Sequence, residues 1–190
     1  YMGLYPITLG ISRPNKKSAR TRPSAGSSSG DPTKIPQDLK TKILERDKHT
    51  CGCCGFQSQK YQEVLFKNGN PYDQSESNLM TTCIFCHQCF SLEKVSEMRS
   101  GVLIWLPEVE QYQLHNIARA IYIARISQGP AADAARRILE VLMTRRDEVK
   151  KRISTDNPQI LSTVLKDYLG PGHYKARTKK LDGVRLFPLD

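Results

Sequence analysis

Apolar residues recur at intervals of three and four positions through much of the chain, which is the spacing of amphipathic helices. The pattern predicts helices at 108–127, at 131–153, and from Asn157 to a stop at Gly170-Pro171. The inward residues expected in the first two are Leu114, Ile117, Ile121 and Ala124, then Ala135, Ile138, Leu139, Leu142, Val149 and Ile153. An earlier helix is expected at 36–47, with Leu39, Ile43 and Leu44 on its buried face.

Shorter runs predict strands between these helices. The run 61–66 precedes an Asn-Gly turn signal. The run 101–107, GVLIWLP, is continuously apolar, as in a buried strand, and Trp105 within it is expected in the core. A strand-like piece at 4–11 and a short helix at about 87–97 complete the pattern.

These elements predict an α+β fold, in which a small mixed core precedes a mainly helical part. We expect four segments. They are an N-terminal strand and basic flexible arm (1–35), a cysteine-containing core (36–107), a helical part (108–170) and a basic, then apolar, tail (171–190). The arm, RPNKKSARTRPSAGSSSGDPTK, has the Ser, Gly and Pro content of a linker.

Charge is distributed unevenly along the chain. The net charge of +10 raises the question of a nucleic acid or an anionic surface as partner. Residues 1–50 carry +6, however, whereas 51–107, which hold all the cysteines, carry −1. A module that binds phosphates concentrates positive charge near its site. The charge pattern therefore does not favour nucleic acid.

All six cysteines lie between positions 51 and 89. The start of the chain lacks the basic end and long apolar centre of a secretory signal, and no run approaches the roughly 18 apolar residues of a membrane span. We therefore expect an intracellular protein, in which clustered cysteines bind metal in preference to forming disulfides.

The sequence contains two C-x-x-C knuckles, Cys51-Gly-Cys-Cys54 and Cys83-Ile-Phe-Cys86, with 28 residues between them. Two thiolates three residues apart can bind one ion from a tight turn, and two such turns complete a tetrahedron. The spacing predicts one structural zinc ion held by Cys51, Cys54, Cys83 and Cys86. An iron–sulfur cluster also takes four thiolates. A thioredoxin-like redox pair is a weaker alternative, because no βαβ pattern surrounds either knuckle.

Three further residues could take part in this site. Cys53 lies inside the first knuckle, where it cannot easily point at the same ion. Cys89 and His87 follow the second knuckle and are candidates for alternative ligands or for residues that lie behind the ligands.

Two segments resemble zinc-containing HNH nucleases. LKTKILERDKHTCGCCG resembles their opening, where a helix ends in an Arg-Asp pair before the first knuckle, and SNLMTTCIFCHQC resembles their closing segment. The resemblance covers about 37–95 and implies a ββα core that contains the zinc.

The catalytic residues of HNH nucleases are not all matched. These enzymes use a second metal and a histidine that acts as general base on water. Counting back from Asn78-Leu79 at the family's spacing places Glu63 at the acid and Val64 at the base, and no histidine lies between 55 and 82. His87 matches the downstream histidine of the family, but Phe90 replaces its lysine. We therefore expect no catalysis.

A second resemblance covers nearly the whole chain after residue 37. RDKHTCGCCGFQSQKYQEV, NLMTTCIFCHQCFSLE and GVLIWLPE are similar to the IcmJ/DotN family of type IVB secretion systems. The resemblance implies a non-catalytic, zinc-containing adaptor in the type IV coupling complex. Such a subunit would bind the C-terminal segment of the coupling ATPase (DotL-like) and other coupling-complex subunits, and would help to recruit effector substrates.

The same resemblance implies a cytoplasmic protein that reaches the inner membrane only indirectly, through its partners, and that has no small-molecule substrate. The sequence does not identify the partner-binding residues. Two other functions remain as alternatives: an HNH-type metal-dependent endonuclease, and a zinc protein that binds nucleic acid without catalysis.

Overall fold

The computed structural model describes residues 3–14 and 33–189. Most of the predicted basic arm, at 15–32, lies outside the described residues. Contacts divide the chain into two compact units, each described by itself below. The cysteine unit comprises Tyr1–Pro6 and Ser12–Phe90, and the helical unit comprises Ile7–Ile11 and Ser91–Asp190.

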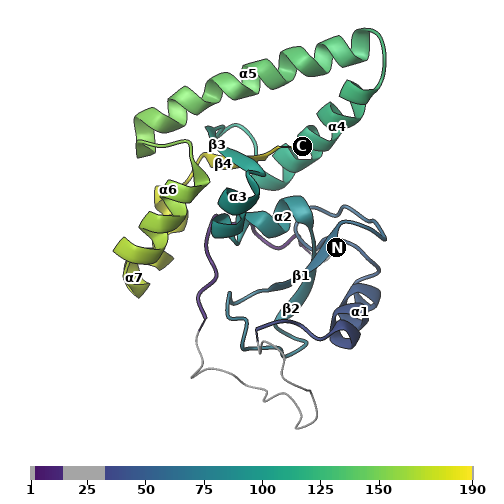
Figure 1. Ribbon diagram of the computed structural model, residues 1–190, viewed down its shortest axis with the longest axis vertical. Coiled ribbons are helices and arrows are strands. Elements are labelled where there is room, and N and C mark those ends of the chain that lie inside the picture. Colours follow the sequence, from purple (N-terminus) through teal and green to yellow (C-terminus); the bar gives the residue numbers. More distant parts are fainter. Residues whose placement is uncertain (1–2, 15–32, 190) are drawn as a thin grey trace. The chain divides into compact units, whose positions relative to one another are not determined.

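The cysteine unit is built around a β-hairpin. Strands β1 (Gln62–Phe66) and β2 (Leu79–Cys83) pair antiparallel, with Gln62 opposite Cys83 and Phe66 opposite Leu79. Helix α1 (Gln37–Arg46) precedes the hairpin, and α2 (Ile84–Cys89) follows it directly (Figure 1). The order β1–β2–α2 agrees with the expected ββα arrangement.

The predicted buried face of α1 covers one side of this hairpin. Ile43 is fully buried and packs with Val64 and Leu79. Leu39, Leu44 and Phe66 border the same cluster and are partly exposed. This core confirms the helix and the strand predicted at 36–47 and 61–66.

The helical unit contains a second antiparallel pair, β3 (Gly101–Trp105) with β4 (Val184–Pro188). Helix α4 (Gln111–Ile126) packs against β4, and the long α5 (Pro130–Ile153) packs against both α4 and β3. The two helices form an antiparallel hairpin (Figure 1). All five residues of β4 are buried, so the apolar end of the predicted tail is a core strand.

At the centre of each outer edge of the β3–β4 pair, another part of the unit bonds the backbone. The Gln111 side chain donates to the Leu186 carbonyl (2.7 Å) and accepts from the Leu186 N–H (2.9 Å). On the opposite edge, the Leu103 N–H donates to the Asp156 carbonyl (2.9 Å). Leu103 and Leu186 are register partners and form a non-hydrogen-bonded pair, since their backbone groups bond elsewhere. In such a pair, both residues turn their N–H and C=O groups away from the partner strand. These groups therefore find partners at each edge.

Short helices complete the helical unit. These are α3 (Leu92–Met98), α6 (Pro158–Thr163), the π-helical turn η2 (Val164–Tyr168), α7 (Pro171–Lys175) and α8 (Arg177–Lys180). Asn157 caps α6 as predicted, since its Oδ1 accepts from the Gln159 N–H at 2.8 Å. No described helix combines the length and apolar character needed to cross a membrane.

The N-terminal piece expected as a strand forms no strand in the part of it that the structure describes. Residues 7–11 are instead held by side chains of the tail. Arg177 Nε donates to the Leu9 carbonyl (2.9 Å), and the Tyr174 hydroxyl bonds both backbone groups of Ile11. A Cβ on Gly10 would come within 2.7 Å of that hydroxyl. Side chains of the tail therefore bond the backbone of residues 7–11, in place of the neighbouring strand that the sequence pattern suggested.

Several residues predicted to lie in the core are less buried than expected. Ile117 is 37% and Ile138 48% exposed. Trp105 is only partly buried, and the Arg152 guanidinium lies 3.9 Å from its ring centroid. Helical spacing places Ile117 and Ile138 near the buried stripe but does not specify how far a neighbouring element extends.

The basic side chains of α5 are largely paired within the helical unit. Arg145 Nη2 lies 3.1 Å from Glu108, and Arg146 Nε lies 2.6 Å from Asp156. Further pairs join Lys150, Lys151 and Arg152 to Asp147, Glu148 and Asp156. Exposed pairs contribute only about 0–1 kcal/mol each. They nevertheless reduce the positive charge that this helix presents to a phosphate backbone.

Replacing Gln111 by methionine should destabilise the helical unit. The change removes both partners of the Leu186 backbone in a buried place, and an unsatisfied buried group costs about 1–3 kcal/mol. Denaturant unfolding should show this loss, whereas the exposed control Gln128→Met should stay within about 0.5 kcal/mol of wild type. Equal stability of both variants would show that Gln111 does not support β4.

Candidate metal centre

The first knuckle is a tight turn held against β2. The Cys51 N–H donates to the Phe56 carbonyl, and the Gly55 N–H donates back to the Cys51 carbonyl, both at 2.9 Å. The Gly52 N–H donates to Thr81 of β2, also at 2.9 Å. Gly55 has φ +75°, a conformation that glycine adopts without strain. The turn therefore presents Cys51 and Cys54 from one short loop.

The second knuckle lies where β2 passes into α2. Cys83 is the last residue of β2 and the N-cap of α2, and Cys86 lies in the first turn of the helix. Both side chains are buried, with exposed fractions of 1% and 0%. Strand and helix thus fix the direction of both thiols.

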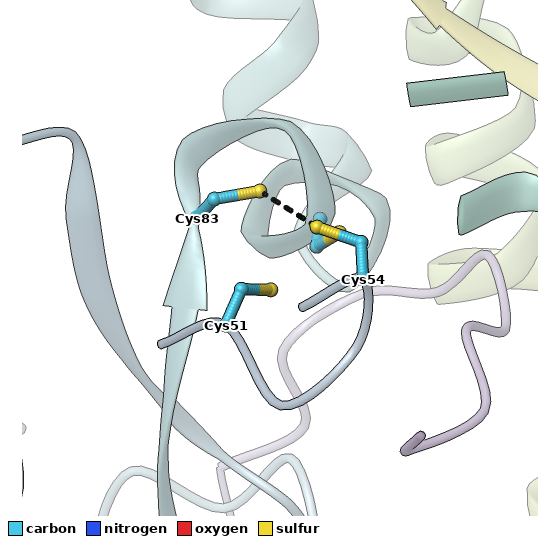
Figure 2. A group of neighbouring side chains, drawn as sticks. Cys51, Cys54 and Cys83 are labelled. Carbon is cyan, nitrogen blue, oxygen red and sulfur yellow. Dashed lines mark hydrogen bonds between the residues drawn. The ribbon is translucent and has the colours of Figure 1, made fainter. Parts of the chain in front are cut away.

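The four knuckle sulfurs converge. The Sγ atoms of Cys51, Cys54, Cys83 and Cys86 all lie within 4.8 Å of one another. Figure 2 shows the sulfurs of Cys54 and Cys83 facing each other, 3.7 Å apart, with Cys51 turned toward the same space. Tetrahedral zinc with Zn–S bonds of about 2.3 Å requires sulfurs about 3.8 Å apart, whereas a disulfide requires about 2.05 Å. The cluster could therefore hold a metal ion.

The electrostatics of the cluster also favour a cation. Hydrogen bonds from neighbouring thiols, that of Cys53 first, lower the pKa of Cys51. The interaction with Cys51 in turn raises the pKa of both Cys83 and Cys86 well above the ordinary thiol value. Buried thiolates at such short range repel one another, so the four thiols cannot all ionise without a counter-charge. A divalent cation removes this conflict and allows four thiolates.

The other candidate residues lie outside the group of four. Cys53 is buried, and its pKa is raised, chiefly by its hydrogen bond with Cys51. Cys89 is fully buried, which raises the pKa of its thiol, and its Sγ donates weakly to the Phe85 carbonyl at 3.6 Å. His87 is half-buried on α2. Among the described residues, none of the three has a ligand atom that joins the four-sulfur cluster.

Sequence reasoning missed the side chains that support the first knuckle. Gln62 of β1 donates through Nε2 to the carbonyls of His49 and Phe56, on the two sides of the turn, at 3.1 and 3.0 Å. The Tyr5 N–H donates to the Gly52 carbonyl at 2.8 Å. A glutamine in a short strand carries no sequence signal for such a role.

The Arg-Asp pair before the first knuckle connects α1 to β2. Arg46 donates to both carboxylate oxygens of Asp47, at 2.7 and 3.0 Å, and the Thr81 N–H donates to Asp47 Oδ2 at 2.8 Å. Burial alone would raise the pKa of Asp47, but these hydrogen bonds outweigh it and hold the pKa below its ordinary value. The pair therefore favours an ionised Asp47.

Val64 and Glu63, the positions that correspond to the base and the acid of a nuclease, both contact other side chains of the fold. Val64 is 4% exposed and packs with Ile43 and Leu79. The Glu63 carboxylate lies 2.8 Å from Lys40 Nζ of α1. A valine cannot accept a proton, and the glutamate already has a cationic partner.

These features define a class of protein: an α+β chain in which a four-cysteine centre joins the two ends of a β-hairpin unit, followed by a helical unit. No protein-family model matches the chain. It is 32% identical over 151 residues to the type 4 apparatus protein DotN of Legionella pneumophila. The matched region covers 77% of this chain and 70% of DotN. The chain belongs to the IcmJ/DotN family of type IVB secretion systems.

The cluster should bind about one divalent ion per chain. Cys86→Ser should lose most of the bound metal and unfold the cysteine unit, because metal-binding free energy at such sites is also folding free energy. Cys89→Ala, which changes a buried thiol outside the cluster, should retain the ion. Metal analysis and chelator-dependent melting would measure both effects, and a folded Cys86→Ser protein with full metal content would contradict the assignment.

Asp47→Asn should destabilise the protein at pH 7 by about 1.5–3 kcal/mol, the range for hydrogen bonds to a charged group. Because the folded-state pKa of Asp47 is lowered, its ionised form stabilises the fold above the unfolded pKa of about 3.9. The difference between variant and wild type should therefore shrink only as the pH falls below about 4, toward the lower folded-state pKa. Unfolding over the pH range in which wild type is folded would measure it.

The matched control is Asp133→Asn, in an exposed ion pair with Arg136. Exposed pairs contribute little, so this change should stay within about 0.5 kcal/mol at all pH values. An Asp47→Asn effect that is no larger than the control, or that is independent of pH, would remove the proposed role of the carboxylate.

Proposed function

We propose that this protein is a non-catalytic, zinc-containing adaptor subunit of a type IVB secretion coupling complex. In this proposal it binds the C-terminal region of the coupling ATPase and helps to recruit effector substrates. The observation that carries the proposal is the 32% identity to the type 4 apparatus protein DotN across most of both chains.

The chemistry of the cluster supports zinc as the bound metal. Four thiolates are the donor set of structural zinc sites, and a site closed by four protein ligands leaves no position for substrate or water. Cys51, Cys54, Cys83 and Cys86 would hold the ion. Its contribution would be to keep the turn, the hairpin and α2 together.

The surroundings of Glu63 and Val64 support an adaptor in preference to a nuclease. A hydrolytic HNH site needs a general base within hydrogen-bond reach of water. Val64 instead belongs to the apolar cluster beside α1, and Lys40 neutralises Glu63. The internal pairing of the α5 cations gives no support to the nucleic-acid alternative.

The proposal includes a location. A coupling-complex subunit of this kind would be cytoplasmic and would lie at the inner membrane through its partners. Its connection to the membrane would therefore depend on the coupling ATPase.

Co-purification tests the proposal directly. The full chain and the C-terminal region of the coupling ATPase, expressed together, should elute as one complex at moderate salt. A stable complex that survives nuclease treatment would support the adaptor role. Failure of two folded proteins to associate would overturn it, and Mg²⁺-dependent plasmid cleavage by the purified chain would favour the endonuclease alternative.

A further inference from the structure

Aliphatic side chains are exposed on both helices of the α4–α5 hairpin. On α4, Ile123 and Ile126 are 68% and 87% exposed. On α5, Ile138 and Val141 are 48% and 63% exposed. Each pair has i,i+3 spacing, so its members lie on one side of their helix. Single exposed aliphatic residues are common, but exposed pairs on two helices that pack together indicate an interaction surface.

The exposed side of α5 is the side that meets the sheet further along the helix. Eleven residues make about three turns, so Val141 lies in line with Arg152. The Arg152 guanidinium is stacked on the ring of Trp105 in β3. Ile138 and Val141 therefore lie on the Trp105 side of α5 in its N-terminal half, beside the buried stripe of Leu142 and Val149, whereas β3 and β4 lie beside the C-terminal half (Figure 1).

The same geometry holds for α4. Ile126 lies three turns beyond His115, which is fully buried 2.9 Å from the Gln111 amide that bonds β4. One turn before Ile126, the Tyr122 hydroxyl donates to the Pro188 carbonyl at 2.5 Å. That bond brings Leu189, 37% exposed, to this side of α4. Ile123, Ile126, Ile138, Val141 and Leu189 are named here the hairpin face.

Hydrogen bonds at the edges of the β3–β4 pair favour a helix over a strand as the segment that the partner contributes. A strand added to a sheet needs unpaired backbone groups along an edge. Gln111 occupies those of Leu186, and the Asp156 carbonyl occupies that of Leu103. A helix laid on the hairpin face needs no backbone partner, because its own groups are paired internally.

The net positive charge of α4 and α5 favours an acidic partner segment. Helix α4 contains Arg119 and Arg125 and no Asp or Glu, and 111–153 together carry nine Lys/Arg against four Asp/Glu, a net +5. Acidic residues beside an apolar stripe would complement such a rim and speed association. Because the α5 cations are largely paired within the unit, the two arginines of α4 are the ones that would meet such acidic residues.

We propose that the hairpin face is a docking surface for an acidic amphipathic helix of the partner protein. This inference rests on the proposed function, because it takes the C-terminal region of the coupling ATPase as the source of that helix. It assigns the binding to the helical unit and leaves the cysteine cluster a structural role.

Substitutions at the centre of the hairpin face test the assignment. Ile126→Glu and Val141→Glu, each in the full chain, should weaken binding to the ATPase C-terminal region by about 30-fold, as expected for central interface residues. Ile126→Leu should bind like wild type. Ile160→Glu, a matched control at a 52% exposed isoleucine on α6, should change the affinity less than about threefold. Calorimetric titration would measure Kd, and thermal melting would confirm that all variants fold.

The outcomes separate this inference from the proposed function. If wild type binds and Ile126→Glu and Val141→Glu bind equally well, the hairpin face is not the docking surface, and the adaptor role stands. If wild type does not bind, both fall. If the variants keep partner binding but lose self-association, or lose binding to vesicles of anionic phospholipid, the face contacts a second copy or a lipid surface and the proposal is overturned.

Discussion

Repulsion between buried thiols is the constraint on which the cysteine unit depends. Two short turns bring four sulfurs within 4.8 Å in a place where water is excluded. Ionisation of Cys51 raises the pKa of Cys83 and Cys86, so the thiols cannot all be charged without a cation. The surrounding bonds, from Gln62 to the turn and from Asp47 to β2, hold the sulfurs at this separation. The local geometry is therefore consistent with a site that is complete only with metal bound.

The helical unit depends on a different constraint, the pairing of a strand at the end of the chain. β4 contributes five buried residues, among them Leu186 and Phe187 at zero exposure, to a core that α4 and α5 cover. Two strands alone are marginally stable in water. Gln111 bonds both outward backbone groups of Leu186, and the Asp156 carbonyl accepts from the outward N–H of Leu103, so other parts of the unit support the pair at its centre.

The sequence predicts local features better than their partners. Cysteine spacing identified the four sulfurs that converge, because a C-x-x-C turn brings two thiols together wherever it occurs. Helical spacing identified α1, α4 and α5. It did not show that 184–188 is a strand against 101–105, since this pairing joins residues some 80 positions apart. Ile138 was expected inside because its spacing matches that of Leu142, and only the extent of the sheet shows that it is uncovered.

Sequence spacing does not show which side chains the fold buries, and this matters in both units of the chain. In the cysteine unit, the side chains that a nuclease would use for chemistry have structural partners: Val64 in the core and Glu63 beside Lys40. In the helical unit, Ile126, Ile138 and Val141 are exposed within the part of the chain that the structure describes. Exposed Ile and Val at such density cost solubility unless they are used. The distribution supports the proposed adaptor, which would bind through its helices while the cysteine cluster, with its metal, would keep the first unit folded.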